Sequence, residues 1–284
     1  MILITTAGKV GSAAALLLAQ REVPVKILVR DPAASAGLAR AGVEVIAGDL
    51  RIPASIDAAM RGVAGVVLVS PAVPAEELNV IDSAVRAGVN HVVKVTSKSS
   101  LDSPIVRRRG QAQIENALIA CGLGYTLLRN NAYMQNFFML APAIAATGGF
   151  GASAGDGRIG MIDTRDVADV AAWIAVAPEP HAGKTYWPTG PEVVSYADAA
   201  AVLSEALGRP VAYRQLTFEQ QKQAMVNAGL PINVAEDNAR ALGLFADGDA
   251  DYTTDDVPTL IGRPARTFKQ FVADYAQAWQ ISLA

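Results

Sequence analysis

The sequence is poor in the residues that bind metals and form disulfides. It has one cysteine, Cys121, and two histidines, His91 and His181, in 284 residues. A single cysteine excludes an internal disulfide and a cysteine-based metal cluster, and two histidines exclude a histidine-rich metal centre. We therefore expect no bound metal. Cys121 ends a helical run, and we interpret it as buried packing.

Charge and long hydrophobic runs are also scarce. Charged residues make up 18% of the chain, and the formal net charge is −3. This balance offers no basic surface for nucleic acid or for an anionic membrane. No apolar run reaches the roughly 18 residues of a membrane span, and the N-terminus lacks the basic segment of an export signal. These features predict a cytoplasmic protein, a monomer or a homodimer, whose partner is a small molecule.

The chain does contain a regular alternation of short apolar runs and helical patterns. The apolar runs end in small, polar or charged residues and span 2–4, 25–29, 43–47, 66–69, 91–95 and 125–128. Apolar strands that alternate with helices indicate a parallel sheet with right-handed crossovers. We therefore predict an α/β fold with a doubly wound, Rossmann-like sheet.

The sequence after residue 132 is less regular. We expect helices over 133–146, 164–177, 195–207, 218–228 and 268–280, a loop over 148–160 and a short strand over 211–216. Two domains follow from this pattern. Residues 1–132 and 155–190 would form the dinucleotide-binding domain, and residues 133–154 and 191–284 a smaller, mostly helical substrate-binding subdomain.

The first eleven residues predict a phosphate-binding turn. The strand run 2–4 is followed by Gly8 and Gly11 and then by a helical run over 12–20. This order places backbone N–H groups at a helix N-terminus, where a pyrophosphate can bind. Gly8 would let the backbone approach the phosphates, and Gly11 would let the helix pack closely. Such turns usually open with a glycine where this chain has Thr5, and on spacing alone an ordinary turn is the alternative.

The ends of the predicted strands suit a cofactor crevice. Ligands on a doubly wound sheet bind outside the carboxyl ends of its strands. We therefore predict that the cofactor contacts Thr6, Gly8, Lys9, Val10, Gly11, Arg30, Asp49, Leu50, Ser70, Pro71, Thr96, Ser97 and Asn130.

Arg30 bears on the choice of cofactor. It ends the second strand about 20 residues past the glycine turn, where an NAD-specific site would hold an acidic residue. An arginine suits a 2′-phosphate, so we expect NADP(H) to be preferred over NAD(H). The alternative is a solvated arginine paired with Asp31. Asp49 could accept a hydrogen bond from adenine, with Leu50 against the ring, or it could cap the following turn.

Several motifs, taken in order, resemble those of one family. They are Gly8-Lys9-Val10-Gly11, Leu28-Val29-Arg30, Gly48-Asp49-Leu50, Gln113-Ile114-Glu115, Tyr125-Thr126-Leu127-Leu128-Arg129-Asn130, Tyr133-Met134-Gln135-Asn136-Phe137-Phe138, Asp163-Thr164-Arg165-Asp166-Val167-Ala168, and Leu260-Ile261-Gly262-Arg263-Pro264 with Thr267-Phe268. The chain resembles the NmrA-like, atypical branch of the short-chain dehydrogenases/reductases. Within it, the chain is similar to bacterial NAD(P)H:quinone oxidoreductases and triphenylmethane dye reductases. The resemblance implies an NAD(P)H-dependent oxidoreductase that transfers hydride to a flat, quinone- or dye-like acceptor.

The usual acid/base pair of classical relatives is missing. Those enzymes use a tyrosine with a lysine four residues later, which lowers the pKa of the phenol for proton transfer. No tyrosine of this chain has a lysine at that spacing, and the corresponding helix carries Gln111 and Glu115. We therefore name no catalytic acid or base. Catalysis would instead consist of holding nicotinamide and acceptor face to face.

An aromatic and methionine-rich stretch is the predicted acceptor site. Its members are Tyr133, Met134, Phe137 and Phe138. Flat apolar substrates stack on aromatic rings, and methionine adapts to varied shapes. The alternative is that this stretch belongs to the hydrophobic core. A second function also stays open, a non-enzymatic NADP(H)-binding redox sensor that signals through a protein partner and needs no acceptor site.

Overall fold

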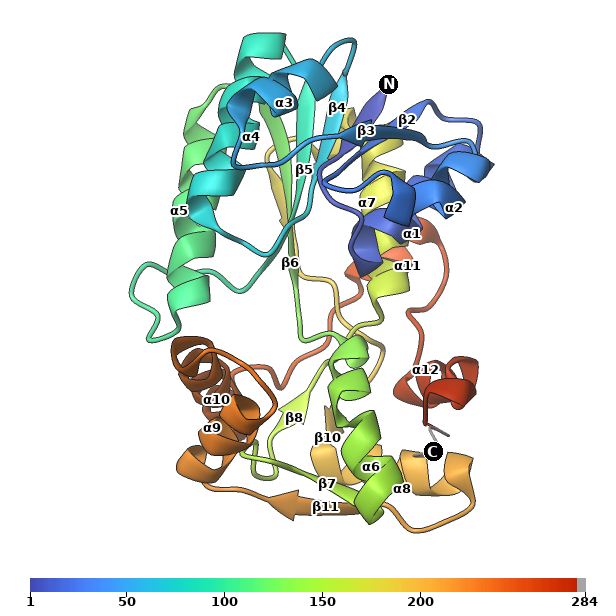
Figure 1. Ribbon diagram of the computed structural model, residues 1–284, viewed down its shortest axis with the longest axis vertical. Coiled ribbons are helices and arrows are strands. Elements are labelled where there is room, and N and C mark those ends of the chain that lie inside the picture. The colour runs from blue at the N-terminus through green and yellow to red at the C-terminus, as the bar shows by residue number, and fades with distance from the viewer. Residues whose placement is uncertain (280–284) are drawn as a thin grey trace. The chain divides into compact units, whose positions relative to one another are not determined.

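The computed structural model describes residues 1–279, which divide into two compact units (Figure 1). Unit 1 comprises Met1–Asn130, Thr164–Pro188 and Asp256–Arg263. Unit 2 comprises Asn131–Asp163, Thr189–Asp255 and the residues from Pro264 onward. Four segments lie outside the domains we expected for them, since 131–132, 155–163 and 189–190 belong to unit 2 and 256–263 belongs to unit 1.

The segment Asp256–Arg263 returns to unit 1 late in the chain and is held there by ion pairs. Helix α11 (Asp256–Ile261) packs against helix α7 (Thr164–Val176). Just after α11, the Arg263 guanidinium donates hydrogen bonds to Asp166, at 2.7 Å, and to Asp169. The sequence gives no sign of this contact because the partners are almost a hundred residues apart.

Unit 1 is built on a parallel sheet whose strand order is β3-β2-β1-β4-β5-β6-β9. The strands are β1 (Ile2–Ile4), β2 (Val25–Val29), β3 (Glu44–Ala47), β4 (Gly65–Leu68), β5 (His91–Ser97), β6 (Gly124–Asn130) and β9 (Lys184–Tyr186). The first six confirm the predicted runs. The sequence analysis missed β9 because this short edge strand is largely exposed and lacks an apolar run. The strand order reverses between β1 and β4, which makes this the topological switch point.

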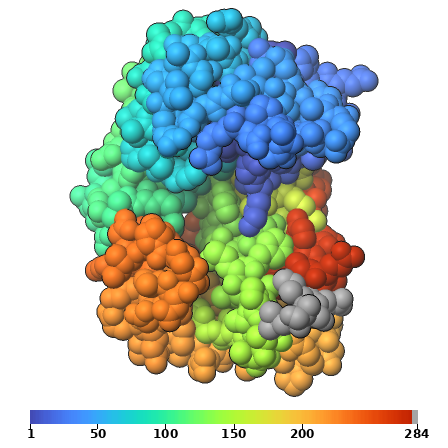
Figure 2. Space-filling model, in the orientation of Figure 1, coloured from blue at the N-terminus to red at the C-terminus, as the bar shows by residue number. Residues whose placement is uncertain are grey.

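Helices cover both faces of this sheet (Figure 1). One face carries α3 (Pro53–Ala59), α4 (Pro74–Ala87) and α5 (Val106–Ala120), packed side by side, and the other carries α1 (Lys9–Gln20) and α7. A short turn η1 (Ala33–Ser35) and α2 (Ala36–Arg40) follow β2. Apolar side chains of the sheet and of α3–α5 form one continuous buried cluster. The face of unit 1 built by the first half of the chain is blue and cyan in Figure 2.

Unit 2 combines helices with two small sheets. Its helices are η2 (Met134–Leu140), α6 (Ala141–Thr147), α8 (Tyr196–Leu207), α9 (Phe218–Asn227), α10 (Ile232–Ala246), α12 (Phe268–Asp274) and η4 (Ala276–Trp279). Strand β7 (Gly149–Ala152) pairs in parallel with β11 (Ala212–Gln215), and β8 (Arg158–Ile159) pairs antiparallel with β10 (Val194–Ser195). The unit is mostly helical, as predicted.

Details of unit 2 differ from the sequence analysis. The helix expected over 133–146 is a 3₁₀ stretch followed by a short α-helix, and the loop expected over 148–160 contains β7 and β8. The helix α10 was not predicted. The closing helix ends at Asp274, and Gln280, its expected last residue, lies outside the described residues. Within residues 1–279, no helix is both long and apolar enough to span a bilayer.

Candidate dinucleotide site at the carboxyl edge of the sheet

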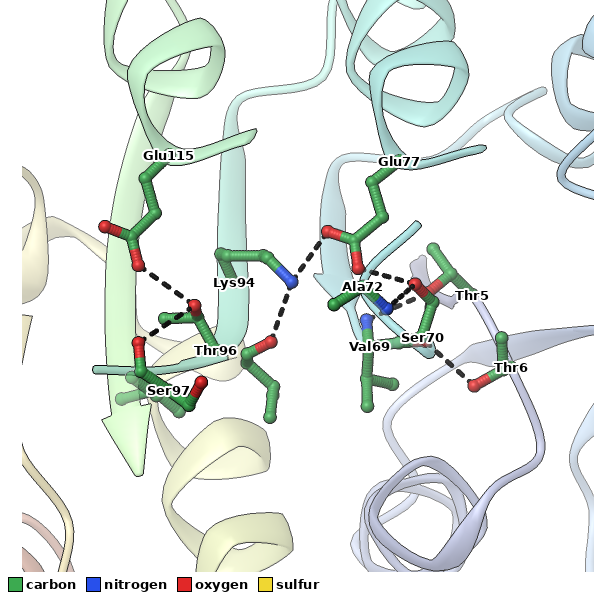
Figure 3. Close-up of polar contacts among 12 residues, drawn as sticks. Thr5, Thr6, Val69, Ser70, Ala72, Glu77, Lys94, Thr96, Ser97 and Glu115 are labelled. Atoms are coloured by element: carbon green, nitrogen blue, oxygen red, sulfur yellow. Dashed lines mark hydrogen bonds and ion pairs between the residues drawn. The ribbon is translucent and has the colours of Figure 1, made fainter. Parts of the chain in front are cut away.

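The chain segments that leave β1 and β4 are joined by hydrogen bonds at the switch point. The Thr5 hydroxyl accepts from the backbone N–H of Val69 at 2.9 Å and donates to the carbonyl of the same residue at 2.8 Å (Figure 3). The Thr6 hydroxyl donates to that carbonyl as well, at 2.8 Å. Thr5 is 1% exposed. The threonine at the usual glycine position therefore points into the sheet and extends the pairing of β1 with β4.

The two glycines of the turn have different reasons for being glycine. A Cβ on Gly11 would lie 1.9 Å from the Thr6 carbonyl oxygen, so α1 packs directly on the turn only because Gly11 has no side chain. A Cβ on Gly8 would have Thr6 Oγ1 as its nearest neighbour, at 3.9 Å. Gly8 is exposed, and its φ of −72° is open to any residue. Packing within the described chain therefore does not require glycine at position 8.

The N-terminus of α1 can receive an anion. Gly8 is its N-cap, no side chain caps it, and its first turn has no acidic residue. The positive end of the helix dipole and the first backbone N–H groups thus face outward beside the exposed Gly8. The sequence-predicted Lys9 is exposed at the same helix start, whereas Val10 and Gly11 are buried.

The end of β2 presents an unpaired guanidinium. Arg30 is exposed and forms no ion pair with any other residue of 1–279. Asp31, which the sequence offered as a partner, instead accepts a hydrogen bond from the Ala33 N–H at 2.9 Å. The Asp31 carboxylate therefore caps the turn that follows β2.

The end of β3 holds a charge pair that the sequence analysis missed. Asp49 accepts hydrogen bonds from the Arg51 guanidinium and, at 2.9 Å, from the Arg51 backbone N–H. The Arg51 side chain donates the hydrogen bond that most strongly holds the pKa of the Asp49 carboxyl far below its usual range, and the positive charge of Arg30 adds to this effect. Leu50 turns the other way and lies in the core cluster of unit 1. An arginine two residues after an aspartate was the available signal.

Ser70 and Pro71 follow β4, and Thr96 and Ser97 end β5. Pro71 is exposed, and Ser70 and Ser97 are half-buried. Thr96 is buried and donates to Glu115 at 2.9 Å. Asn130, buried at the end of β6, donates from its amide to the carbonyls of Thr96 and Leu128 at 3.1 and 3.0 Å. Thr96 and Asn130 therefore hold the strand ends together and do not present their side chains at the surface.

Two buried glutamates reach this edge from the helices above it (Figure 3). Glu77 of α4 accepts from the Ser70 hydroxyl at 2.5 Å, and Glu115 of α5 accepts from Ser99 at 2.6 Å and from Arg129 at 2.6 Å. Arg129 in turn lies with its guanidinium carbon 5.2 Å from the centre of a Trp187 ring. Both glutamates stand in amphipathic helix patterns that look solvent-facing, which is why sequence reasoning missed Glu77 and assigned Glu115 no contact.

The predicted acceptor residues, all in unit 2, have different environments. Met134 and Phe137 are fully buried, and Phe137 stacks on Tyr196 and meets Phe268 edge to face in the core of that unit. Tyr133 is half-buried. Phe138 is also half-buried and contacts the rings of Phe271, Tyr275 and Trp279. Met134 and Phe137 are thus core residues, and only Tyr133 and Phe138 keep exposed surface.

The fold of unit 1 is Rossmann-like. Its strand order, with the reversal between β1 and β4 and a glycine turn leading from β1 into α1, is the arrangement in which dinucleotides bind across the switch point. The chain belongs to the NmrA-like family, whose model matches residues 1–270.

Individual relatives agree with this assignment. The chain is 37% identical over 286 residues to the NAD(P)H azoreductase of Xenophilus azovorans, covering 98% of this chain and 99% of the relative. It superposes on the Escherichia coli NADPH-dependent quinone oxidoreductase in complex with NADPH with a TM-score of 0.87 at 29% identity, covering 96% and 99% of the two chains. For the Citrobacter sp. triphenylmethane reductase with NADP(H), the TM-score is 0.86 at 29% identity, covering 98% and 100%.

Proposed function

We propose that this protein is an NAD(P)H-dependent oxidoreductase that transfers hydride to a flat conjugated acceptor of the quinone, azo or cationic dye type. The observation that carries the proposal is the exposed Gly8 beside the uncapped N-terminus of α1. Nothing in the described chain needs a glycine there, whereas a pyrophosphate that approaches the backbone does. The names of the relatives, an azoreductase, a quinone oxidoreductase and a triphenylmethane reductase, support the same reaction class.

The residues that would hold the cofactor lie at the carboxyl edge of the unit 1 sheet. Backbone N–H groups of the turn from Thr6 to Gly11 would bind the pyrophosphate. The Arg30 guanidinium, which forms no ion pair within residues 1–279, suits the 2′-phosphate of NADPH because it is charged and offers a fork of donors. Ser70, Pro71 and Ser97 border the path between the ends of β1, β4 and β5, where the rest of the dinucleotide would lie.

When bound, NADPH supplies the hydride, and the protein supplies position and exclusion of water. No Tyr–Lys pair of the classical spacing is available for proton transfer. A quinone or a cationic dye takes hydride at an electron-poor carbon without prior protonation, and solvent can deliver a later proton. Tyr133 and Phe138, which keep exposed surface, are the aromatic residues we propose for stacking against the acceptor.

An acceptor screen tests this function. The protein is mixed with NADPH and with a set of quinones, azo dyes, triphenylmethane dyes and conjugated unsaturated lactones, and oxidation of NADPH is followed by its absorbance. We expect turnover with at least one class. A matched reaction with Gly8→Ala protein should be slow, because that variant is expected to fold but to bind the cofactor poorly. Tight NADPH binding without turnover of any acceptor would instead support the redox sensor.

A further inference from the structure

A lysine lies in the middle of a central strand of the parallel sheet. The Lys94 side chain of β5 is 0% exposed, and its ammonium nitrogen is 2.6 Å from Oε2 of Glu77, whose side chain is also 0% exposed (Figure 3). The same nitrogen donates to the Val95 carbonyl at 2.8 Å. Removing two charges from water is costly, and well-packed apolar residues at such a pair are often neutral or stabilising. Stability alone therefore does not explain this pair.

The pair is the first part of a chain of contacts that leads to the cofactor edge. The other oxygen of Glu77, Oε1, accepts from the Ser70 hydroxyl at 2.5 Å, and the Ser70 oxygen accepts from the Ala72 N–H at 3.3 Å. The Lys94 ammonium on β5 thus holds the Glu77 carboxylate in place. Glu77 in turn holds the segment 70–72, which follows β4, through its hydrogen bond with Ser70. Each link is drawn in Figure 3.

The segment 70–72 is held in a conformation that it would not adopt without support. Ala72 has a φ of +63°, in the left-handed region that alanine rarely adopts. Such a residue persists only where its surroundings determine it. Val69, just before the segment, is held by hydrogen bonds from the hydroxyls of Thr5 and Thr6 to its carbonyl. Within the segment, the hydrogen bond of Ser70 to Glu77 provides the second attachment.

We propose that the Lys94–Glu77 pair is a positioning device, which acts through Ser70 to keep residues 70–72 in the conformation that receives the cofactor. The inference rests on the proposed function, because that function places Ser70 and Pro71 beside the dinucleotide. Lys94 and Glu77 are positioning residues, since both are buried and reach the cofactor edge only through Ser70. Loss of the hydrogen bond to Ser70 would reduce the fraction of molecules ready to bind. A fall of that fraction to about one tenth raises the apparent Kd about tenfold.

Two matched double variants separate positioning from stability. Both replace Lys94 by methionine, so that neither leaves a buried ammonium unpaired. Glu77→Leu/Lys94→Met removes the acceptor for Ser70, whereas Glu77→Gln/Lys94→Met retains one in the amide oxygen. The control is Thr126→Val, which removes hydrogen bonds to His91 and to the His181 carbonyl at the start of β6. The measurements are Kd for NADPH, the thermal midpoint, and hydrogen exchange of the peptide covering residues 69–74.

We expect the leucine variant to bind NADPH about tenfold more weakly, with faster exchange in residues 69–74, at a midpoint close to that of the native protein. The glutamine variant should bind NADPH more tightly than the leucine variant, because Ser70 keeps an acceptor, but more weakly than the native protein, because Lys94 no longer holds that acceptor in place. Thr126→Val should lower the midpoint and leave both Kd and the exchange of 69–74 unchanged. Equal Kd values for the two double variants would overturn the inference, since a merely structural pair makes no distinction between them.

Two further experimental outcomes can be told apart from those above. A native protein that does not bind NADPH overturns the proposed function, while the exchange measurement still decides whether the pair controls the segment. If the leucine variant fails to fold, Ser70→Ala gives the decision, because it cuts the link and leaves the ion pair intact. Unchanged exchange of residues 69–74 in Ser70→Ala refutes the inference.

Discussion

Gly8→Ala should abolish tight cofactor binding in a protein that remains folded. The added Cβ meets no heavy atom closer than Thr6 Oγ1 at 3.9 Å, and the backbone at Gly8 is open to alanine. The folding cost is the loss of a preferred N-cap residue, about 0.5–1 kcal/mol. The binding cost is larger. In the proposed site, the methyl group would occupy the space through which a phosphate of the cofactor would reach the N–H groups at the start of α1.

The expected loss of NADPH affinity can be estimated from the hydrogen bonds to the phosphates that the methyl group would prevent. A hydrogen bond to a charged group contributes about 1.5–3 kcal/mol. Losing one of them raises Kd for NADPH roughly ten- to hundredfold, since about 1.4 kcal/mol is a factor of ten. Isothermal calorimetry gives Kd, and thermal unfolding gives the change in stability of the same preparation.

Gly11→Ala is the matched control, because we expect it to reduce folding stability more than the space available to the cofactor. Its Cβ would lie 1.9 Å from the backbone oxygen of Thr6, which cannot move aside as a flexible side chain would. Overpacking of this kind costs about 1–3 kcal/mol, so this variant should lose stability first. Native-like NADPH affinity in Gly8→Ala would refute the reasoning, because it would mean that the phosphates do not approach the chain at this turn.

The other predictions concern cofactor choice, the acceptor and acid stability. Arg30→Glu should remove a preference for NADPH over NADH of roughly tenfold, the low end of an arginine–phosphate contact, and equal Kd values for the two cofactors in the native protein would contradict this. Tyr133→Ala should change kcat or KM for bulky acceptors while Kd for NADPH is unchanged, whereas Phe137→Ala, in the core of unit 2, should lower the thermal midpoint; loss of cofactor binding by Tyr133→Ala would count against its role. Burial lowers the pKa of His91 below its ordinary 6.5, against the opposing charge of Glu179, and also lowers that of His181, so both bind protons more weakly when folded. The stability that these two neutral histidines contribute is therefore fully present above about pH 6.5 and is lost as the pH decreases below it. Urea unfolding across that range should show a smaller decrease in the free energy of unfolding for His91→Gln than for the native protein.

Most of the sheet could be predicted from the sequence because its five inner strands are largely buried, and because the edge strand β3, although exposed or half-buried, keeps the apolar residues 45–47. Such strands appear as short continuous apolar runs, and six of the seven were found in this way. The glycine turn was also predictable, since the spacing of Gly8 and Gly11 after an apolar strand is a local signal. The edge strand β9 escaped because exposure removes the apolar run on which the prediction depends.

The side-chain contacts at the edge could not be predicted, because they join residues distant in sequence. Thr5 looked like a defect of the glycine motif, yet its hydroxyl pairs with a residue 64 positions later. Leu50, Thr96 and Asn130 were expected at the cofactor, and the structure turns all three inward. A pattern shows that a residue ends a strand, but the direction of its side chain depends on the pleat and on the partners it finds.

Buried charge is distributed unevenly over the sheet of unit 1, and this distribution is itself informative. At the amino edge, the buried side chains His91 and Thr126 satisfy each other as neutral groups at 2.9 Å. Lys94 in the middle of β5, and Glu77 and Glu115 on the helices, are buried in ion pairs with partners on other elements. A buried ion pair gains little net stability over apolar packing, but breaking it costs several kcal/mol, so it holds its neighbours in one arrangement. Glu77 and Glu115 also accept hydrogen bonds from Ser70 and Ser99, which follow β4 and β5. These buried groups therefore hold the segments that leave the two strands, as the proposed site, which would act by positioning, requires.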